Sequence, residues 1–212
     1  YNLLSGCLWS FALLNVVATA GVFGDLRTVF KLTHVWTTAI QLLAVVEIYN
    51  SATGLVRSPL FTTVMQVTSR LVVVLGVWTL LPEAAGNASY AYLSVHVAWG
   101  LAEVVRYYYY ATNLMSQQQG NPTTVPPTLE WLRYNAFIVL YPLGISSECY
   151  MIYYAVAAAA ARDGVFFAAY ALFLCLTLVL YVPGTVVLFS HMLKQRAKFN
   201  AQRRQAPAKK TL

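Results

Sequence analysis

YNLLSGCLWSFALLNVVATAGVFG, residues 1–24, contains no charged side chain, and the first one follows at Asp25. A helix needs about 20 mostly apolar residues to cross the hydrocarbon core of a bilayer, so this stretch predicts a membrane span at 3–23. Five further apolar stretches of comparable length follow, at 32–50, 60–81, 88–114, 132–160 and 165–190. The sequence therefore predicts an all-α, polytopic membrane protein whose bundle contains six transmembrane helices.

The composition of the chain also indicates a membrane protein. Hydrophobic residues make up 59% of the chain and charged residues 10%, whereas soluble domains average about 25% charged residues. Seven of the 14 lysines and arginines lie after His191, which is typical of a cytosolic segment beside a membrane span that touches anionic lipid, and argues against nucleic-acid binding. We expect a membrane domain at 1–193 and a basic cytosolic tail at 194–212. Because six spans return the chain to its starting side, both termini are expected in the cytosol.

Five ionisable side chains lie inside the predicted spans: Glu47, Arg70, Glu103, Arg106 and Glu148. A charged side chain at the centre of a membrane helix costs about 2.5–3.5 kcal/mol on insertion scales, so these groups must pair with one another or line a wet cavity. In the predicted orientation three of them lie near the cytosolic ends of their spans, and Arg70 and Glu148 lie nearer the middle. We therefore predict one polar cavity that opens to the cytosol.

The spacing of the polar residues places them on shared helix faces. Gln66 and Arg70 are four residues apart and share one face. Tyr141, Gly144 and Glu148 share another, with a rise of about 10.5 Å between the first and the last, and Gly144 leaves a gap between the two larger side chains. The span at 88–114 carries a third such stripe, formed by Glu103, Arg106, Tyr107 and Tyr110.

Glu148 differs from the other intramembrane charges, because its span contains no other charged residue between Arg133 and Arg162. Without an ion-pair partner nearby in the sequence, this carboxyl is better explained by a function than by packing. In the same span Pro142 lacks the N–H that would bond the carbonyl of Ile138, so we expect a local bend or an ordered water there.

Structural explanations exist for part of this set. An Arg–Glu pair between membrane helices often acts only as a packing clamp, and Glu103 with Arg106 fits that interpretation equally well. Glu47 also suits a helix end near the lipid headgroups, and the tyrosines at 107–110 include candidates for an interfacial aromatic belt. Such explanations cover one or two pairs, whereas five intramembrane charges favour a functional site.

These residues resemble the 3-hydroxyacyl-CoA dehydratases of very-long-chain fatty acid elongation, a family also called protein-tyrosine-phosphatase-like membrane proteins. The main match is LRY…F…LYPLG…E at 132–148. Further matches are Glu47, GLVRSP at 54–59, Gln66, SR at 69–70, Trp99, Glu103, RY at 106–107 and Tyr110. The resemblance spans nearly the whole chain. One departure is Asn50, where many members of the family have His.

The resemblance implies a reaction and a set of site residues. The reaction is the loss of water from a long-chain 3-hydroxyacyl-CoA to give the trans-2-enoyl-CoA, the third step of very-long-chain fatty acid elongation. Tyr141 and Glu148 are implied as the catalytic pair, and the supporting or substrate-binding positions are Glu47, Gln66, Arg70, Glu103, Arg106, Arg133 and Gly144. A proton must leave the carbon beside the thioester and another must reach the departing hydroxyl. A carboxyl and a phenol suit this chemistry without a metal or an organic cofactor, and the sequence leaves open which of them is the base.

The C-terminal sequence KKTL at 209–212 resembles a dilysine retrieval signal of the endoplasmic reticulum, which requires a cytosolic tail. The resemblance accordingly implies an endoplasmic-reticulum membrane protein that meets other fatty acid elongase components. A transporter is one alternative, but transporters often contain inverted repeats and no internal repeat is visible here. A catalytically inactive scaffold is another, against which the intact pair of Tyr141 and Glu148 argues.

Phosphatase activity and metal binding find no support in the cysteines. A tyrosine phosphatase needs a cysteine thiolate with an arginine six positions later, and none of Cys7, Cys149 and Cys175 has one. The three cysteines also lack the spacing of a zinc site or a disulfide framework. They are best explained as small apolar side chains within the spans.

Overall fold

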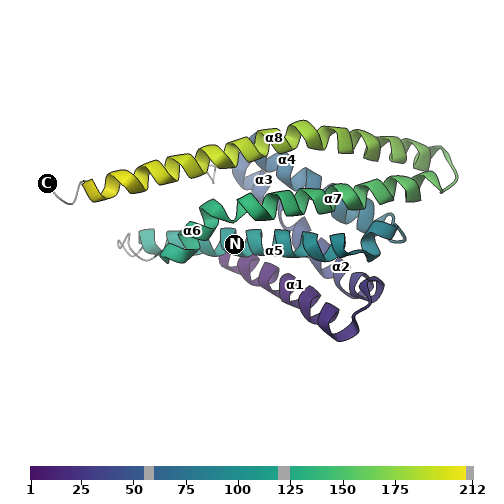
Figure 1. Ribbon diagram of the computed structural model, residues 1–212, viewed down its shortest axis with the longest axis horizontal. Helices are drawn as coiled ribbons and strands as arrows, with labels where there is room; N and C mark the ends of the chain where they lie inside the picture. The colour runs from purple at the N-terminus through teal and green to yellow at the C-terminus, as the bar shows by residue number, and fades with distance from the viewer. Residues whose placement is uncertain (55–59, 119–124, 209–212) are drawn as a thin grey trace.

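The computed structural model of the protein describes residues 1–54, 60–118 and 125–208. Their elements are α1 (Asn2–Phe23), α2 (Leu26–Leu42), α3 (Val45–Ala52), α4 (Leu60–Leu71), the π-helix η1 (Val72–Thr79), the 3₁₀ helix η2 (Ala85–Ala88), α5 (Tyr90–Gln118), α6 (Pro127–Asn135), α7 (Phe137–Ala160) and α8 (Val165–Ala208). No strand occurs in these ranges (Figure 1), so the all-α prediction is confirmed.

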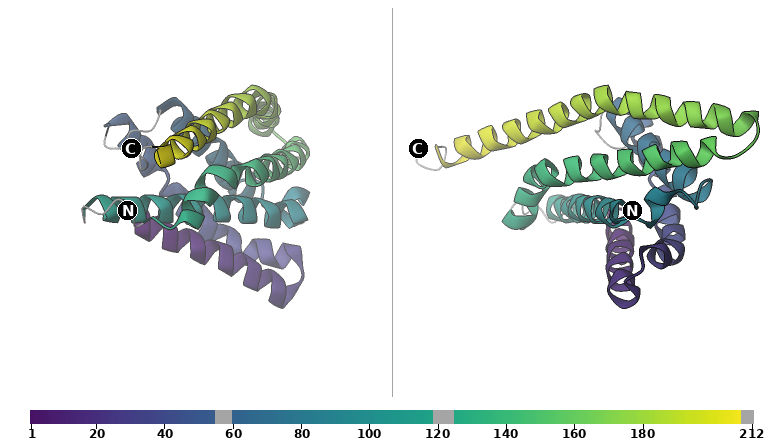
Figure 2. Two further views of the ribbon diagram at one scale, coloured as in Figure 1. Left: turned by 60° about the vertical axis from the view of Figure 1, so that its left-hand side comes forward. Right: turned by 45° about the vertical axis from the view of Figure 1, so that its right-hand side comes forward.

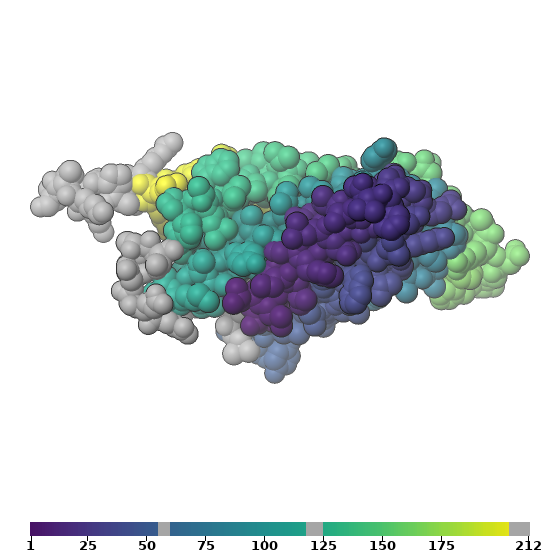
Figure 3. Space-filling model, turned by 90° about the horizontal axis from the view of Figure 1, so that it is seen from below, coloured from purple at the N-terminus to yellow at the C-terminus, as the bar shows by residue number. Residues whose placement is uncertain are grey.

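Helix α5 is the centre of the bundle. It contacts α1 and α7 along its length, and η2 and α6 also touch it. Figure 2 shows α7 and α8 side by side with α8 continuing beyond the rest of the bundle, and Figure 3 shows α1 lying obliquely across one face. Large buried side chains from η1, α5 and α7, among them Trp78, Tyr92, Trp99 and Met151, form the core where these elements meet.

The turn between the first two helices is fixed by local sequence. Gly24 ends α1 with φ of 68°, a left-handed conformation that glycine adopts without strain. Asp25 then caps α2 by accepting hydrogen bonds from the Thr28 backbone N–H at 2.9 Å and the Thr28 hydroxyl at 2.7 Å. The second helix therefore begins at Leu26, six residues before the predicted start of its span, and the chain breaks again before α3.

Four helical segments of the described residues are long and apolar enough to cross a membrane, and a fifth is added if the bent pair α6–α7 forms one span. These segments are Asn2–Phe23, Leu26–Ala52, Leu60–Thr79 and Val165–Arg203. They identify the chain as a membrane protein. Helix α5, predicted as a further span, is not among them, because polar and charged residues interrupt its apolar character.

The predicted fifth span, 132–160, is divided by a bend. Helices α6 and α7 meet at 45° around Ala136, whereas we expected the bend at Pro142. Helix α7 continues through Pro142 without a break. Because a proline ring crowds the turn that precedes it, a bend on the N-terminal side of Pro142 is the physically reasonable place for the chain to change direction.

Helix α8 is the longest element, and its apolar window is the least buried of the four candidate spans. Only 6% of its apolar window is buried. The helix passes through residues 193 and 194 without interruption, and beyond them Phe199 stacks on Tyr134 of α6 with ring centroids 4.1 Å apart. The first part of the predicted tail thus packs on α6. The boundary at 193 remains a prediction, and the terminal KKTL lies outside the described residues.

Candidate active site

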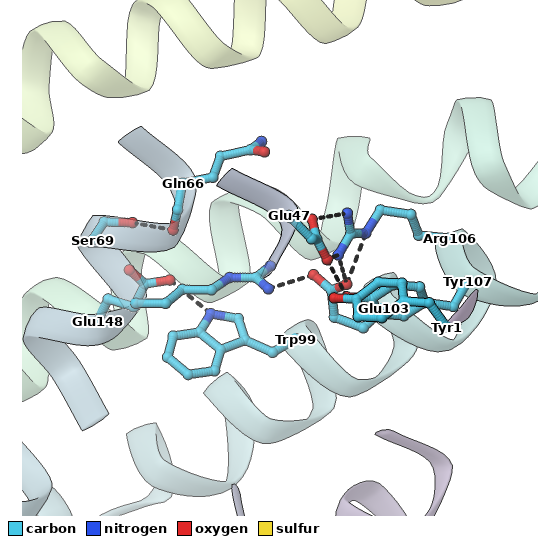
Figure 4. A network of polar contacts seen from close by, with 10 residues as sticks. Tyr1, Glu47, Gln66, Ser69, Trp99, Glu103, Arg106, Tyr107 and Glu148 are labelled. Carbon is cyan, nitrogen blue, oxygen red and sulfur yellow. Dashed lines mark hydrogen bonds and ion pairs between the residues drawn. The ribbon is translucent and has the colours of Figure 1, made fainter. Parts of the chain in front are cut away.

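Four of the five charged side chains predicted inside the spans form one continuous network (Figure 4). One carboxylate oxygen of Glu103 accepts a hydrogen bond from Arg70, and the other accepts one from Arg106 Nε at 2.8 Å. Arg106 also donates to both oxygens of Glu47, at 2.6 and 2.7 Å. Two carboxylates and two guanidinium groups leave the network with no net charge.

The network joins three helices. Glu47 lies in the first turn of α3, where the helix dipole stabilises an anion, and Arg70 lies near the end of α4, which continues directly into η1. Glu103 and Arg106 lie one turn apart on α5 and therefore share a face. Glu103 is 3% exposed, so its charge depends on both arginines.

Two tyrosines extend the network towards the N-terminus. Tyr107 donates a hydrogen bond to Glu47, and its ring lies 4.4 Å from the Arg106 guanidinium, within cation–π range. The Tyr1 hydroxyl lies 3.5 Å from the Tyr107 hydroxyl and donates to the carbonyl of Leu43 at 3.3 Å. The first residue of the chain is thereby tied to the same cluster.

Glu148 lies beside this network and is held by a different pair of donors. Its Oε1 accepts a hydrogen bond from Trp99 Nε1 at 2.8 Å, and its Oε2 accepts one from the Tyr181 hydroxyl at 2.7 Å. The Arg70 guanidinium lies 5.2 Å from the Trp99 ring, so the indole contacts both Glu148 and the ion-pair network. The carboxyl is buried, with 6% of its residue surface exposed.

Tyr141 lies two turns before Glu148 on α7 and presents a different environment. Its ring stacks on Phe189 of α8, with centroids 5.7 Å apart. Its buried hydroxyl has no hydrogen-bond partner among the described residues, which is unusual for a buried polar atom. Gly144 lies between the two residues, and a Cβ there would be 3.9 Å from Glu148 Oε1. The glycine therefore borders the carboxyl.

Gln66 and Arg133 lie outside the ion-pair network. Gln66 is exposed, and Figure 4 shows its side chain directed away from the charged residues. Arg133 of α6 donates to the Tyr110 hydroxyl at 3.1 Å and lies over that ring. The loop motif at 54–59 lies outside the described residues beyond Gly54.

A hollow of about 550 Å³ lies at the C-terminal end of α7, where Ala157, Ala161 and Arg162 face Glu83 and Ala85. Neither Tyr141 nor Glu148 lines it, and the cavity predicted at those residues remains a prediction. The described residues contain no group of three His, Cys, Asp or Glu side chains able to hold a metal ion. Glu148 and its two donors offer hydrogen bonding and proton transfer.

Sequence reasoning missed Tyr181. It is one of 15 tyrosines, lies in an apolar stretch and belongs to no motif that we recognised. A weak signal was available in the sequence. A tyrosine inside a lipid-facing helix needs a hydrogen-bond partner for its hydroxyl, and Tyr181 lies directly before Val182, Pro183 and Gly184.

Comparison with known proteins adds an independent finding. Residues 41–202 match the family model described as "Protein tyrosine phosphatase-like protein, PTPLA". The chain is 35% identical over 211 residues to the probable very-long-chain (3R)-3-hydroxyacyl-CoA dehydratase of Schizosaccharomyces pombe, covering 100% of this chain and 94% of the relative. It is 34% identical over 180 residues to the dehydratase PASTICCINO 2A of Oryza sativa (78% and 76% covered) and 28% identical over 207 residues to human dehydratase 2 (93% and 78%). No solved structure matches. By the extent of the family match and the identity to these relatives, the chain belongs to the protein tyrosine phosphatase-like family.

Proposed function

We propose that this chain dehydrates a very-long-chain (3R)-3-hydroxyacyl-CoA to the trans-2-enoyl-CoA, the third step of very-long-chain fatty acid elongation. The names of its relatives support the substrate and the reaction. The observation that carries the proposal is the pairing, on one helix, of a buried carboxyl held by two donors with a phenol whose buried hydroxyl has no partner among the described residues.

The reaction moves two protons and breaks one carbon–oxygen bond. A base removes a proton from the carbon beside the thioester, and an acid protonates the hydroxyl as it leaves as water. In the proposed mechanism Glu148 and Tyr141 take these two roles. The unpartnered Tyr141 hydroxyl is free to bond the substrate oxygen, and the carboxyl of Glu148 is oriented by Trp99 and Tyr181 for proton transfer.

The substrate is proposed to reach this pair from the cytosolic side. Arg133, at the α6 end of the bundle, is suited to the phosphates of CoA, while Gly144 leaves room beside the carboxyl for the acyl chain. The proposed positions that support the catalytic pair are Glu47, Gln66, Arg70, Glu103 and Arg106. In this arrangement the polar cavity opens to the cytosol between Tyr141 and Glu148.

The proposed topology has six spans with both termini in the cytosol. Helix α5 supplies the additional span: its 29 residues extend about 43 Å, longer than the roughly 30 Å hydrocarbon core, and α1 and α7 cover it on two sides. The basic residues after His191 support a cytosolic C-terminus. The chain is proposed to reside in the endoplasmic-reticulum membrane beside other elongase components.

Substitution of the pair tests the mechanism. Purified protein in lipid vesicles is assayed on a long-chain (3R)-3-hydroxyacyl-CoA, with the enoyl product measured by mass spectrometry. Tyr141→Phe and Glu148→Gln are each expected to lower kcat by at least about 100-fold, because positioned acids and bases contribute on that order. Matched controls are Tyr153→Phe, on the same helix but 64% exposed, and Glu83→Gln, which lies in the hollow at the end of α7. Both controls are expected to keep normal kcat.

The outcomes separate the competing interpretations. If Tyr141→Phe and Glu148→Gln each keep the kcat of the wild-type protein, the proposed catalytic pair is refuted. A wild-type protein that binds elongase components but forms no enoyl product would instead identify a scaffold.

A further inference from the structure

The carboxyl of Glu148 is contacted by helices on both sides of α7. Trp99 reaches Oε1 from α5, and Tyr181 reaches Oε2 from α8, at 2.8 and 2.7 Å. Among the described contacts no lysine or arginine donates to Glu148, because Arg70 is bonded to Glu103 instead. The two neutral donors are therefore what fixes the orientation of this side chain.

The two donors differ in what they can do when a proton moves. An indole N–H only donates, whereas a phenol hydroxyl both donates and accepts. When Glu148 is ionised, both neighbours donate to it. When Glu148 is protonated on Oε2, Tyr181 can turn its hydroxyl and accept that proton's hydrogen bond, while Trp99 continues to donate to Oε1. The Ser69 hydroxyl also lies within reach of Tyr181, so the phenol keeps a partner after it turns.

The position of Tyr181 on α8 supports a specific role for its hydroxyl. Its neighbours Leu180 and Val182 are 67% and 69% exposed, as expected of a lipid-facing helix. Tyr181 points the other way, into the bundle, and ends against Glu148. A phenylalanine would fill the same space, so the hydroxyl is not needed for packing.

We infer that Tyr181 is a positioning residue that holds Glu148 in both of its protonation states, leaving Trp99 as the fixed support. This inference rests on the proposed function, since it assigns Tyr181 a part in the same proton transfer. Tyr181 acts through Glu148 and does not touch the reacting atoms.

Tyr181→Phe tests the inference by removing the hydroxyl and keeping the ring. We expect kcat to fall by about 10- to 100-fold, the value of one hydrogen bond to a charged group, while KM stays within about twofold because substrate contacts are unchanged. The matched control is Tyr170→Phe on the same helix, whose hydroxyl lies against Gly76 and not against Glu148. It is expected to keep normal kcat.

Infrared spectroscopy of the same proteins gives a readout that does not depend on turnover. The carboxyl stretching band that Glu148→Gln abolishes belongs to Glu148. Tyr181→Phe is expected to shift that band, and Tyr170→Phe is expected to leave it in place. Normal kcat in Tyr181→Phe, or a lower kcat with an unshifted band, would overturn the inference.

The failure of this inference can be told from the failure of the proposed function. If Glu148→Gln is inactive and Tyr181→Phe is fully active, only the role of Tyr181 is lost. If the wild-type protein forms no enoyl product, or if Glu148→Gln is fully active, the proposed mechanism itself is wrong.

Discussion

Glu103 is the most constrained charge of the ion-pair network. It is 3% exposed, and its two carboxylate oxygens are bonded by different arginines, from α4 and from its own helix. A buried carboxylate of this kind is stable only while its partners remain, because the desolvation of the charge has to be offset by nearby cations. The network is therefore sensitive to the loss of any single arginine.

Arg106→Met is expected to destabilise the protein by about 3–5 kcal/mol, since it leaves Glu103 and Glu47 each without a cation that they bond in the native state. The free energy of unfolding in mixed micelles measures this effect. Arg162→Met is the control, because its ion pair with Glu83 is 34% and 49% exposed and such pairs contribute about 1 kcal/mol or less. Equal losses in the two variants would contradict this account of the network.

The sequence revealed the charged part of the site and not its neutral part. Charges are expensive in a membrane, which made Glu47, Arg70, Glu103 and Arg106 conspicuous. We expected such groups to pair or to line a wet cavity, and the structure pairs these four. The contact of Tyr181 with Glu148 depends on how α8 is rotated and placed against α7. That rotation has no signature in a stretch of uniformly apolar residues, so the second donor of the carboxyl could not be predicted.

At the level of elements, the backbones of η2 and α7 pack closely at Gly86. A Cβ on Gly86 would lie 2.9 Å from the Cα of Met151, which is backbone and cannot move aside alone. Gly86→Ala is expected to lower the free energy of unfolding by about 1–3 kcal/mol through overpacking. Gly21→Ala in α1 has nothing within 4 Å and is expected to be neutral or slightly stabilising. Thermal unfolding of both variants checks the contrast, and an unaffected Gly86→Ala would mean that η2 can separate from α7.

The observed helix boundaries agree with the predicted ones where local residues determine them, and they differ from the predicted ones elsewhere. The end of α1 at Phe23 agrees with the predicted span, because Gly24 and Asp25 stop one helix and start the next. The π-helical turn of η1, where the Leu80 N–H bonds the carbonyl of Leu75 at 3.1 Å, has no such local cause. It lies where η1 packs against α2 and α7.

At the level of the whole molecule, protein covers the apolar helices unevenly. Helix α5 is enclosed by its neighbours, whereas 94% of the apolar window of α8 is not buried, as the 6% buried share requires. Hydrocarbon must cover the remaining surface of α8. Two polar contacts help to place α8 against the bundle. Tyr181 donates a hydrogen bond to Glu148, and Arg196 donates one to Asn135.

Because lipid covers most of α8, we expect the rate of the proposed dehydration to depend on the thickness of the surrounding bilayer. The segment Val165–Arg203 has 39 residues and extends about 58 Å, so it must tilt or project from a core of roughly 30 Å, and its tilt responds to mismatch. A change of tilt moves Tyr181 relative to Glu148. Dehydration measured in phosphatidylcholine vesicles of increasing acyl length is expected to pass through a maximum, and in Tyr181→Phe the dependence is expected to flatten. A dehydration rate that is the same at every bilayer thickness would show that α8 is anchored by protein alone. A rate that varies with thickness would mean that the lipid around α8 helps to set how well the Tyr181 phenol supports proton transfer.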